Sequence, residues 1–142
     1  MRYQDGMTGR LFEAKIGNCT QRHVEGTYVS YHKALDLVRK NQGKKSEIIR
    51  QLEEKMSVLL GRRVVGFVAI GSTLDLMHSI DTFFEFAGHP GLATVTVDFT
   101  VNTHKTCGKA DLVVGLEVFE HIDQTALSIA RELRAKMMRA VH

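Results

Sequence analysis

The chain has 142 residues, of which 44% are hydrophobic and 25% are charged, and its formal net charge is +3. The composition is ordinary for a globular protein and the length fits one domain, so residues 1–142 are expected to form a single domain. No apolar run reaches the roughly 18 residues that a membrane-spanning helix needs, which excludes a membrane protein of that kind. The chain opens without a secretory leader pattern and its two cysteines have no regular spacing, so we expect free thiols and a cytoplasmic location.

Basic residues gather in the first half of the chain. Residues 1–66 contain 13 Lys/Arg against 7 Asp/Glu, whereas residues 67–142 contain 6 against 9. Such a split occurs in proteins that bind nucleic acid, and equally where one half of a chain contacts the other. No run of Lys/Arg is longer than two residues and no nucleic-acid-binding motif occurs, so nucleic-acid binding is the last of our functional hypotheses.

The chain begins with a predicted pair of strands. Residues 10–16 alternate between apolar and polar side chains, which is typical of a strand. Gly17-Asn18 then provides a turn signal, and residues 23–30 are rich in Val, Thr and Tyr, which favours a return strand. We therefore expect an N-terminal strand or hairpin.

Two helices are predicted next. The first starts at Tyr31 and stops at Asn41, where the helical repeat of apolar residues is lost. Ser46 is a suitable N-cap for the second, and Gly61 occupies the position at which a left-handed glycine commonly ends a helix. Apolar residues between them recur at spacings of three and four, which predicts an amphipathic helix.

The centre of the chain predicts the core of the fold. Residues 64–70 are nearly all apolar, which is typical of a strand that is covered on both faces. Ser72 then begins a helix that is predicted to continue to Gly88, and Pro90 prevents its extension. A right-handed crossover through this helix would connect the first strand to an alternating strand over residues 93–101.

One more strand and one more helix complete the chain. Residues 112–118 alternate, and a helix is predicted from Asp123 to Val141. The resulting β-α-β-β-α core, preceded by an N-terminal strand or hairpin and two helices, predicts an α+β two-layer sandwich with a mostly antiparallel sheet. The central strand needs a cover on its second face, which the N-terminal helices or a second subunit could provide, and we expect the protein to form a homo-oligomer.

The predicted central helix supplies candidate catalytic residues. His78 and Asp81 are three positions apart, so both side chains would lie on the same face of the helix. A histidine beside a carboxylate suits general acid–base catalysis, and the alternative is an ordinary solvated helix face. Metal binding is another interpretation of these residues, but the polar face of this helix from Asp75 to Glu85 is too long to contact one ion, and any subset would need outside ligands, so we assign no metal site.

Two loops supply further candidates. Gly71, Ser72 and Thr73 lead into a helix N-terminus, where N–H groups and the helix dipole favour an anionic ligand; the alternative is simple N-capping. The loop between the last two strands contains His104 and Cys107 among lysines. Neighbouring cations lower the pKa of a thiol, so Cys107 is a candidate nucleophile, and the alternative is an exposed polar loop.

Two parts of the sequence resemble known families. GSTLDLMHSIDTFFEFAG followed by ATVTVDFTVN resembles the central helix and next strand of hot-dog-fold thioesterases, in which a helix carboxylate, here at Asp81, serves a thioester carbonyl. The chain lacks the HGG-type loop of that family. The predicted α-β-β-α ending is similar to that of peroxide-handling OsmC-type domains, whose helix cysteine has no counterpart here. The first resemblance implies an enzyme that acts on acyl-thioester or carbonyl substrates.

Three functional hypotheses follow. The first is a cytoplasmic domain that self-associates and binds a protein partner or a small anionic ligand, the latter near Ser72 and Thr73. The second is a small enzyme in which Asp81 and His78 act with Cys107 or His104. The third is a nucleic-acid binder with a basic surface. No motif in the sequence specifies a cofactor.

Overall fold

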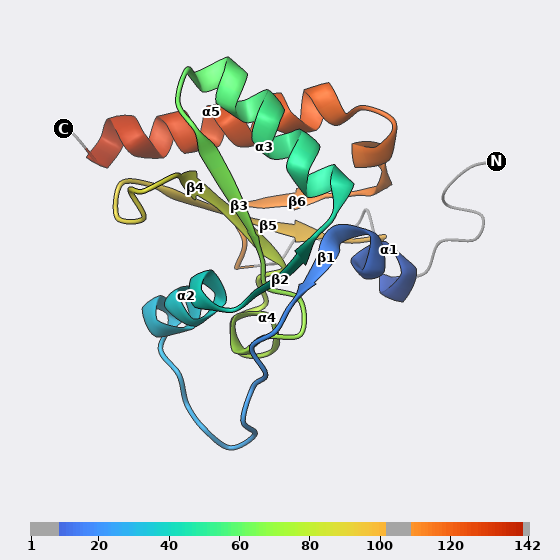
Figure 1. Ribbon diagram of the computed structural model, residues 1–142, viewed down its shortest axis with the longest axis vertical. Helices are drawn as coiled ribbons and strands as arrows, with labels where there is room; N and C mark the ends of the chain where they lie inside the picture. Colours follow the sequence, from blue (N-terminus) through green and yellow to red (C-terminus); the bar gives the residue numbers. More distant parts are fainter. Residues whose placement is uncertain (1–8, 102–108, 141–142) are drawn as a thin grey trace.

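The computed structural model describes residues 9–101 and 109–140. It contains both helices and strands, which confirms the predicted α+β class (Figure 1). In chain order the elements are α1 (Gly9–Ile16), β1 (Gly17–Cys19), α2 (Tyr31–Lys40), β2 (Gln42–Lys45), α3 (Glu47–Leu60), β3 (Val64–Val68), α4 (Thr73–His78), β4 (Thr82–Phe86), β5 (Thr94–Phe99), β6 (Leu112–Val114), the 3-10 helix η2 (Leu116–Phe119) and α5 (Ile122–Ala140).

The main sheet has four strands in the order β3-β4-β5-β6. β4 is antiparallel to both of its neighbours, and β6 is parallel to β5, so the sheet is mostly antiparallel, as predicted. β1 and β2 form a separate antiparallel pair. All five residues of β4 are buried, whereas β3 lies at an edge of the sheet.

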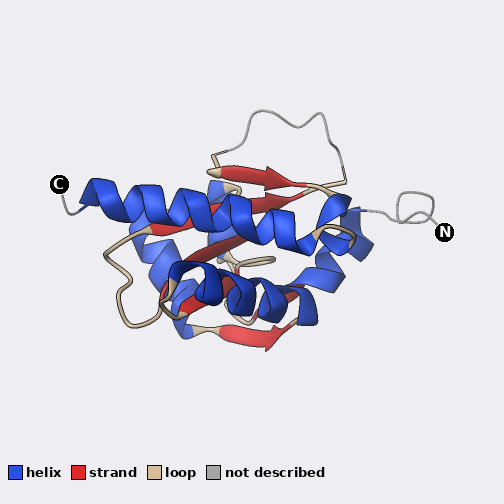
Figure 2. Ribbon diagram, turned by 90° about the horizontal axis from the view of Figure 1, so that it is seen from above, coloured by secondary structure: helices blue, strands red, loops and turns tan. Residues whose placement is uncertain are grey.

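Helices lie on both sides of the main sheet (Figures 1 and 2). α3 and α5 cover one face, where Leu52 and Ile129 are fully buried in the larger apolar cluster. α2 and α4 lie toward the other face, where Leu35 and Leu74 pack with Phe83 of β4 in a second, smaller cluster. The predicted two-layer arrangement describes the half that contains α3 and α5, and α2 with α4 adds cover on the second face.

α3 follows the sequence prediction at both ends. Ser46 is its N-cap and accepts a hydrogen bond from the N–H of Ile49, and Gly61 ends it in the left-handed region at φ 65°. The predicted C-terminal helix is present as α5. The predicted strand over residues 112–118 is shorter than expected, because β6 ends at Val114 and the 3-10 helix follows Gly115. Within the described residues, no helix combines the length and apolar character that crossing a membrane would require.

The predicted N-terminal hairpin is wrong. Residues 10–16 belong to the helix α1, in which Phe12 and Ile16 are almost completely buried. Positions four apart satisfy both an alternating pattern and a helical one, so this short segment fits either structure. Residues 23–30 contain no strand, and β1 pairs instead with β2, more than twenty residues further along the chain.

The predicted helix from Ser72 to Gly88 is wrong in its second half. α4 ends at His78, because Ser79 adopts a left-handed conformation with φ 60° and ψ 41°. The next residues form β4, whose three phenylalanines and one threonine favour a strand. β4 therefore lies between β3 and β5, and the predicted direct crossover between those two strands is also wrong.

The prediction that residues 64–70 form a central strand covered on both faces is wrong as well. β3 is an edge strand, and Val65 and Phe67 are partly exposed. The second face of the sheet is covered within the chain by α2 and α4, so the reason for expecting a second copy to cover β3 does not hold. The outward edge of β3 is closed within the chain as well. Three outward N–H groups donate to side chains: Val64 N to Ser57 Oγ (2.9 Å), Gly66 N to Glu53 Oε2 (2.7 Å) and Val68 N to Gln42 Oε1 (3.0 Å).

Candidate functional site

The turn Gly71-Ser72-Thr73 has its backbone N–H groups engaged inside the chain. Ser72 caps α4, as one of the sequence alternatives predicted. The N–H of Gly71 donates to Asp75 Oδ2, that of Ser72 to Ala69 O and that of Thr73 to Gln21 Oε1, at 2.9, 2.9 and 2.8 Å. An anion at this turn would have to displace these acceptors. Binding there remains a prediction.

His78 and Asp81 do not share a helix face, because α4 ends between them. The His78 ring donates a hydrogen bond from Nε2 to Val29 O at 2.8 Å and packs against Tyr31. Asp81 immediately precedes β4, in a different environment. The element on which the thioesterase resemblance depends, one long helix that carries both residues, is therefore absent. His104 and Cys107 lie outside the described residues.

Asp81 lies opposite Asp98 of the neighbouring strand β5 in the main sheet. The register pairs Thr82 of β4 with Val97 of β5, so the next pair in the antiparallel ladder places these two aspartates opposite each other. Both are buried, with exposed fractions of 9% and 1%. The N–H of Asp81 donates to Asp98 Oδ1 at 3.2 Å, and the N–H of Phe99 donates to Asp81 Oδ2 at 2.9 Å.

This environment changes the protonation of Asp81. Burial, together with the negative charge of Asp98, raises the pKa of Asp81 to about 8, and Asp75 adds to the effect. The hydrogen bond from the N–H of Phe99 acts in the opposite direction and is outweighed. At neutral pH the Asp81 carboxyl group is therefore mostly neutral and can donate a proton.

Asp81 and Asp98 line a cavity of about 270 Å³, which we call the carboxyl pocket. Its remaining lining residues are Glu13, Asp75, Ser79, Phe99, Thr100 and Val101. The lining thus contains four acidic side chains and no basic one in the part of the chain that the structure describes. In the same part, no group of three or more side chains has the placement that a metal ion would need.

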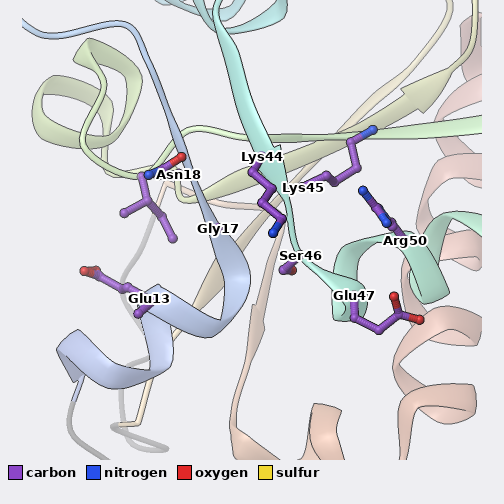
Figure 3. A pocket seen from close by; sticks show the side chains of 10 residues that line it. Glu13, Gly17, Asn18, Lys44, Lys45, Ser46, Glu47 and Arg50 are labelled. Carbon is purple, nitrogen blue, oxygen red and sulfur yellow. The ribbon is translucent and has the colours of Figure 1, made fainter.

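A second cavity, of about 820 Å³, opens at the N-terminus of α3, and we call it the α3 pocket (Figure 3). It forms where α1, the β1–β2 pair and α3 meet. Gly17 permits this meeting, because its φ of 126° disfavours other residues and a Cβ there would lie 3.2 Å from Lys44 O. The lining residues are Glu13, Ala14, Gly17, Asn18, Lys44, Lys45, Ser46, Glu47, Arg50 and Ile70.

Three basic side chains line the α3 pocket. Lys45 is engaged, since its Nζ donates to Glu53 Oε2 at 2.6 Å. Lys44 and Arg50 make no ion pair with any residue in the described ranges 9–101 and 109–140. Figure 3 shows Lys44 extending toward Ser46, while the carboxylate of Glu13 points away from Lys44. Two cations without an ion-pair partner among the described residues therefore flank the start of a helix.

The sequence contained a signal for this pocket. Ser46 is a clear N-cap, Lys44 and Lys45 precede it, and Arg50 lies one turn into the helix. Cations around a helix N-terminus reinforce its preference for anions. The contributions of α1 and β1 had no such signal, because their residues are far away in the sequence and were expected to form a hairpin.

Comparisons of the chain with protein-family models, with curated proteins and with solved structures found no match.

Proposed function

We propose that the protein binds a small anionic ligand in the α3 pocket. The observation that carries this proposal is the position of Lys44 and Arg50, which flank the first turn of α3 without an ion-pair partner among the described residues. The first N–H groups of a helix have no carbonyl partner one turn earlier, so they add donors at the same place.

The shape and lining of the pocket favour a ligand larger than a bare ion. A volume of about 820 Å³ falls in the range of small-molecule sites. Ala14 and Ile70 offer apolar surface beside the cations, and Asn18 offers an amide. Glu13 and Glu47 also line the pocket and limit its net positive charge. These features favour one phosphate or carboxylate group on a small organic body over a long polyanion.

Titration calorimetry with inorganic phosphate and with glycerol 3-phosphate tests the proposal. Lys44→Ala and Arg50→Ala are each expected to weaken binding about tenfold, as the loss of a hydrogen bond to a charged group would. Arg131→Ala removes an equal charge from an exposed position on α5 and should leave the affinity unchanged. If neither compound binds at millimolar concentration, the proposal is contradicted. Tight binding of a single-stranded oligonucleotide alone favours a nucleic-acid binder instead.

A second candidate function is acid–base catalysis at Asp81 on acyl-thioester or carbonyl substrates. The supporting observation is the raised pKa of Asp81, which leaves a neutral carboxylic acid beside Asp98 at pH 7. Such a pair can donate and accept a proton in the same reaction. Catalysis by Asp81 is tested by comparing the rates at which the wild type and Asp81→Asn hydrolyse a panel of esters and thioesters. Equal rates in the two proteins contradict it.

Self-association and a cytoplasmic location also remain proposals from the sequence. Because the edge of β3 is closed, a surface other than β3 is the better candidate for contact between copies. Val58 and Leu59 on α3 are apolar and exposed to 79% and 51%. Light scattering after size-exclusion chromatography measures the mass directly, and Val58→Asp should convert an oligomer that uses this surface into a monomer.

A further inference from the structure

The segment between β3 and β4, residues 69–80, contains α4 and is attached to the sheet near the carboxyl pocket. The N–H of Ala69 donates to Asp81 O at 2.7 Å, which joins the two ends of the segment. The N–H of Gly71 donates to Asp75 Oδ2 at 2.9 Å, which fixes the start of α4. The hydrogen bond from the N–H of Phe99 to Asp81 Oδ2 then connects this end of β4 to β5.

We propose that Asp81 and Asp98 form a pH-controlled latch, which holds residues 69–80 against the sheet while the pair retains a proton and releases them when that proton is lost. The latch is independent of ligand binding in the α3 pocket. It follows from the register, which brings two buried carboxyl groups directly opposite each other on neighbouring strands. Like charges in that position repel each other.

The charged groups around the pair strengthen its response to pH. Two carboxyl groups act on Asp81, Asp98 from β5 and Asp75 from α4, and Glu13 from α1 lines the same pocket. Burial and Asp98 raise the pKa of Asp81 to about 8, so loss of the proton falls in mildly alkaline solution.

The turn beside the pair has a conformation that release would relax. Ser79 lines the carboxyl pocket and connects α4 to β4 at φ 60°, where residues other than glycine are uncommon. Backbone strain of this kind persists only while surrounding contacts hold it. When the contact between β4 and β5 weakens, Ser79 can move to a more favourable conformation and take α4 with it.

Release of residues 69–80 would have a measurable consequence. Leu74 and Ile80 are almost fully buried and belong to the apolar cluster that contains Leu35 of α2. Displacement of α4 exposes these side chains to water. The larger cluster beneath α3 and α5 is separate, so most of the fold should remain intact.

Amide hydrogen exchange at pH 6.5 and pH 9, corrected for the intrinsic dependence on pH, tests the latch. In the wild type, protection of Ala69, Ser79 and Phe99 should fall about tenfold at pH 9, since each pH unit above the pKa changes the protonation ratio tenfold. Protection of Leu52 and Ile129 should not change. An apolar dye should bind at pH 9 and not at pH 6.5.

Two variants and a control complete the experiment. Asp81→Asn cannot lose a proton and should keep its protection at both pH values. If that variant does not fold, Asp98→Asn removes the facing charge and should also abolish the alkaline loss. Asp36→Asn changes an exposed aspartate on α2 and should behave like the wild type. Equal protection of the wild type at the two pH values overturns the proposal, and so does an alkaline loss that persists in the Asp81 or Asp98 variant.

Discussion

The Oε2 atom of Glu53 accepts a hydrogen bond from the backbone N–H of Gly66 at 2.7 Å, in the middle of the outward edge of β3. The same oxygen accepts a hydrogen bond from Lys45 Nζ at 2.6 Å. An uncovered strand edge is a template for association with other chains. One carboxylate on α3 therefore both closes the edge of the sheet and holds a lysine in the wall of the α3 pocket.

Glu53→Ala should destabilise the protein and expose this edge. The N–H of Gly66 and the ammonium group of Lys45 would both lose their acceptor, so we expect the free energy of unfolding to fall by about 1–3 kcal/mol. Urea denaturation measures the change, and light scattering reports aggregation through the uncovered edge. Glu54→Ala is the matched control, because Glu54 is exposed, and it should change stability by no more than about 0.5 kcal/mol. Equal effects of the two substitutions would show that Glu53 does not close the edge.

Arg39→Ala should be among the more damaging substitutions on α2. Arg39 donates two hydrogen bonds to Glu85, from Nε at 2.9 Å and from a terminal nitrogen at 2.5 Å, and the Glu85 side chain is only 2% exposed. Removing the guanidinium group leaves a buried carboxylate without its counter-charge, which costs about 3–5 kcal/mol. The measurement is chemical denaturation at pH 7.

The neighbouring ion pair provides the comparison for Arg39→Ala. Lys40 and Asp36 form an exposed pair on the same helix, so Lys40→Ala should leave the free energy of unfolding nearly unchanged. If both substitutions destabilise the protein to the same extent, burial of Glu85 is not what makes the Arg39 pair strong.

The contribution of Asp81 to the stability of the protein should fall as pH rises from about 4 to about 8. The pKa of Asp81 is raised from 3.8 to about 8 in the folded state, so the unfolded chain releases this proton first. The contribution of Asp81 to stability is thus fully present below pH 4 and is lost as pH approaches 8.

Asp81→Asn should remove this dependence on pH. The amide stays neutral and can still accept the hydrogen bond from the N–H of Phe99, so the variant should be more stable than the wild type at pH 8 and above. Thermal melting between pH 5 and pH 9 makes the comparison. If the melting temperatures of the wild type and of Asp81→Asn change with pH by the same amount over this range, the pKa of Asp81 is not raised.

Gly17→Ala should weaken anion binding by narrowing the α3 pocket. Gly17 has φ 126° and a Cβ there would lie 3.2 Å from Lys44 O, so both the backbone and the wall of the pocket must shift. Gly26→Ala is the matched control, because Gly26 also has a positive φ, of 82°, but no atom lies within 4 Å of an added Cβ. Phosphate titration of both variants separates the effect of a strained backbone, which both variants share, from the effect of a narrower pocket. The affinity for phosphate should fall for Gly17→Ala alone.

Local sequence patterns determined several elements correctly. Ser46 and Gly61 bracket α3, and the apolar repeat between them needs only neighbouring residues to define a helix face. β5 and α5 have equally consistent patterns along their length. Patterns of this kind act over one or two turns of chain, so they can be read without knowing what lies opposite in space.

Where a pattern fits two structures, only the tertiary contacts decided between them. Phe12 and Ile16 satisfy a strand and a helix alike, and the run from Thr82 to Phe86 could extend a helix or form a strand. That run became the interior strand β4 because its aromatic side chains are buried from both faces of the sheet. Propensity differences between helix and strand amount to a fraction of a kcal/mol per residue, and such burial outweighs them.

The candidate sites depend on long-range pairing in the same way. Asp81 could be singled out from the sequence, but its partner Asp98 is seventeen residues away and becomes a partner only through the register of β4 and β5. The α3 pocket likewise joins Lys44 and Arg50 to α1 and β1. Residue types limit which chemistry a chain can support, whereas distances between side chains arise only when the chain folds and buries its apolar surface.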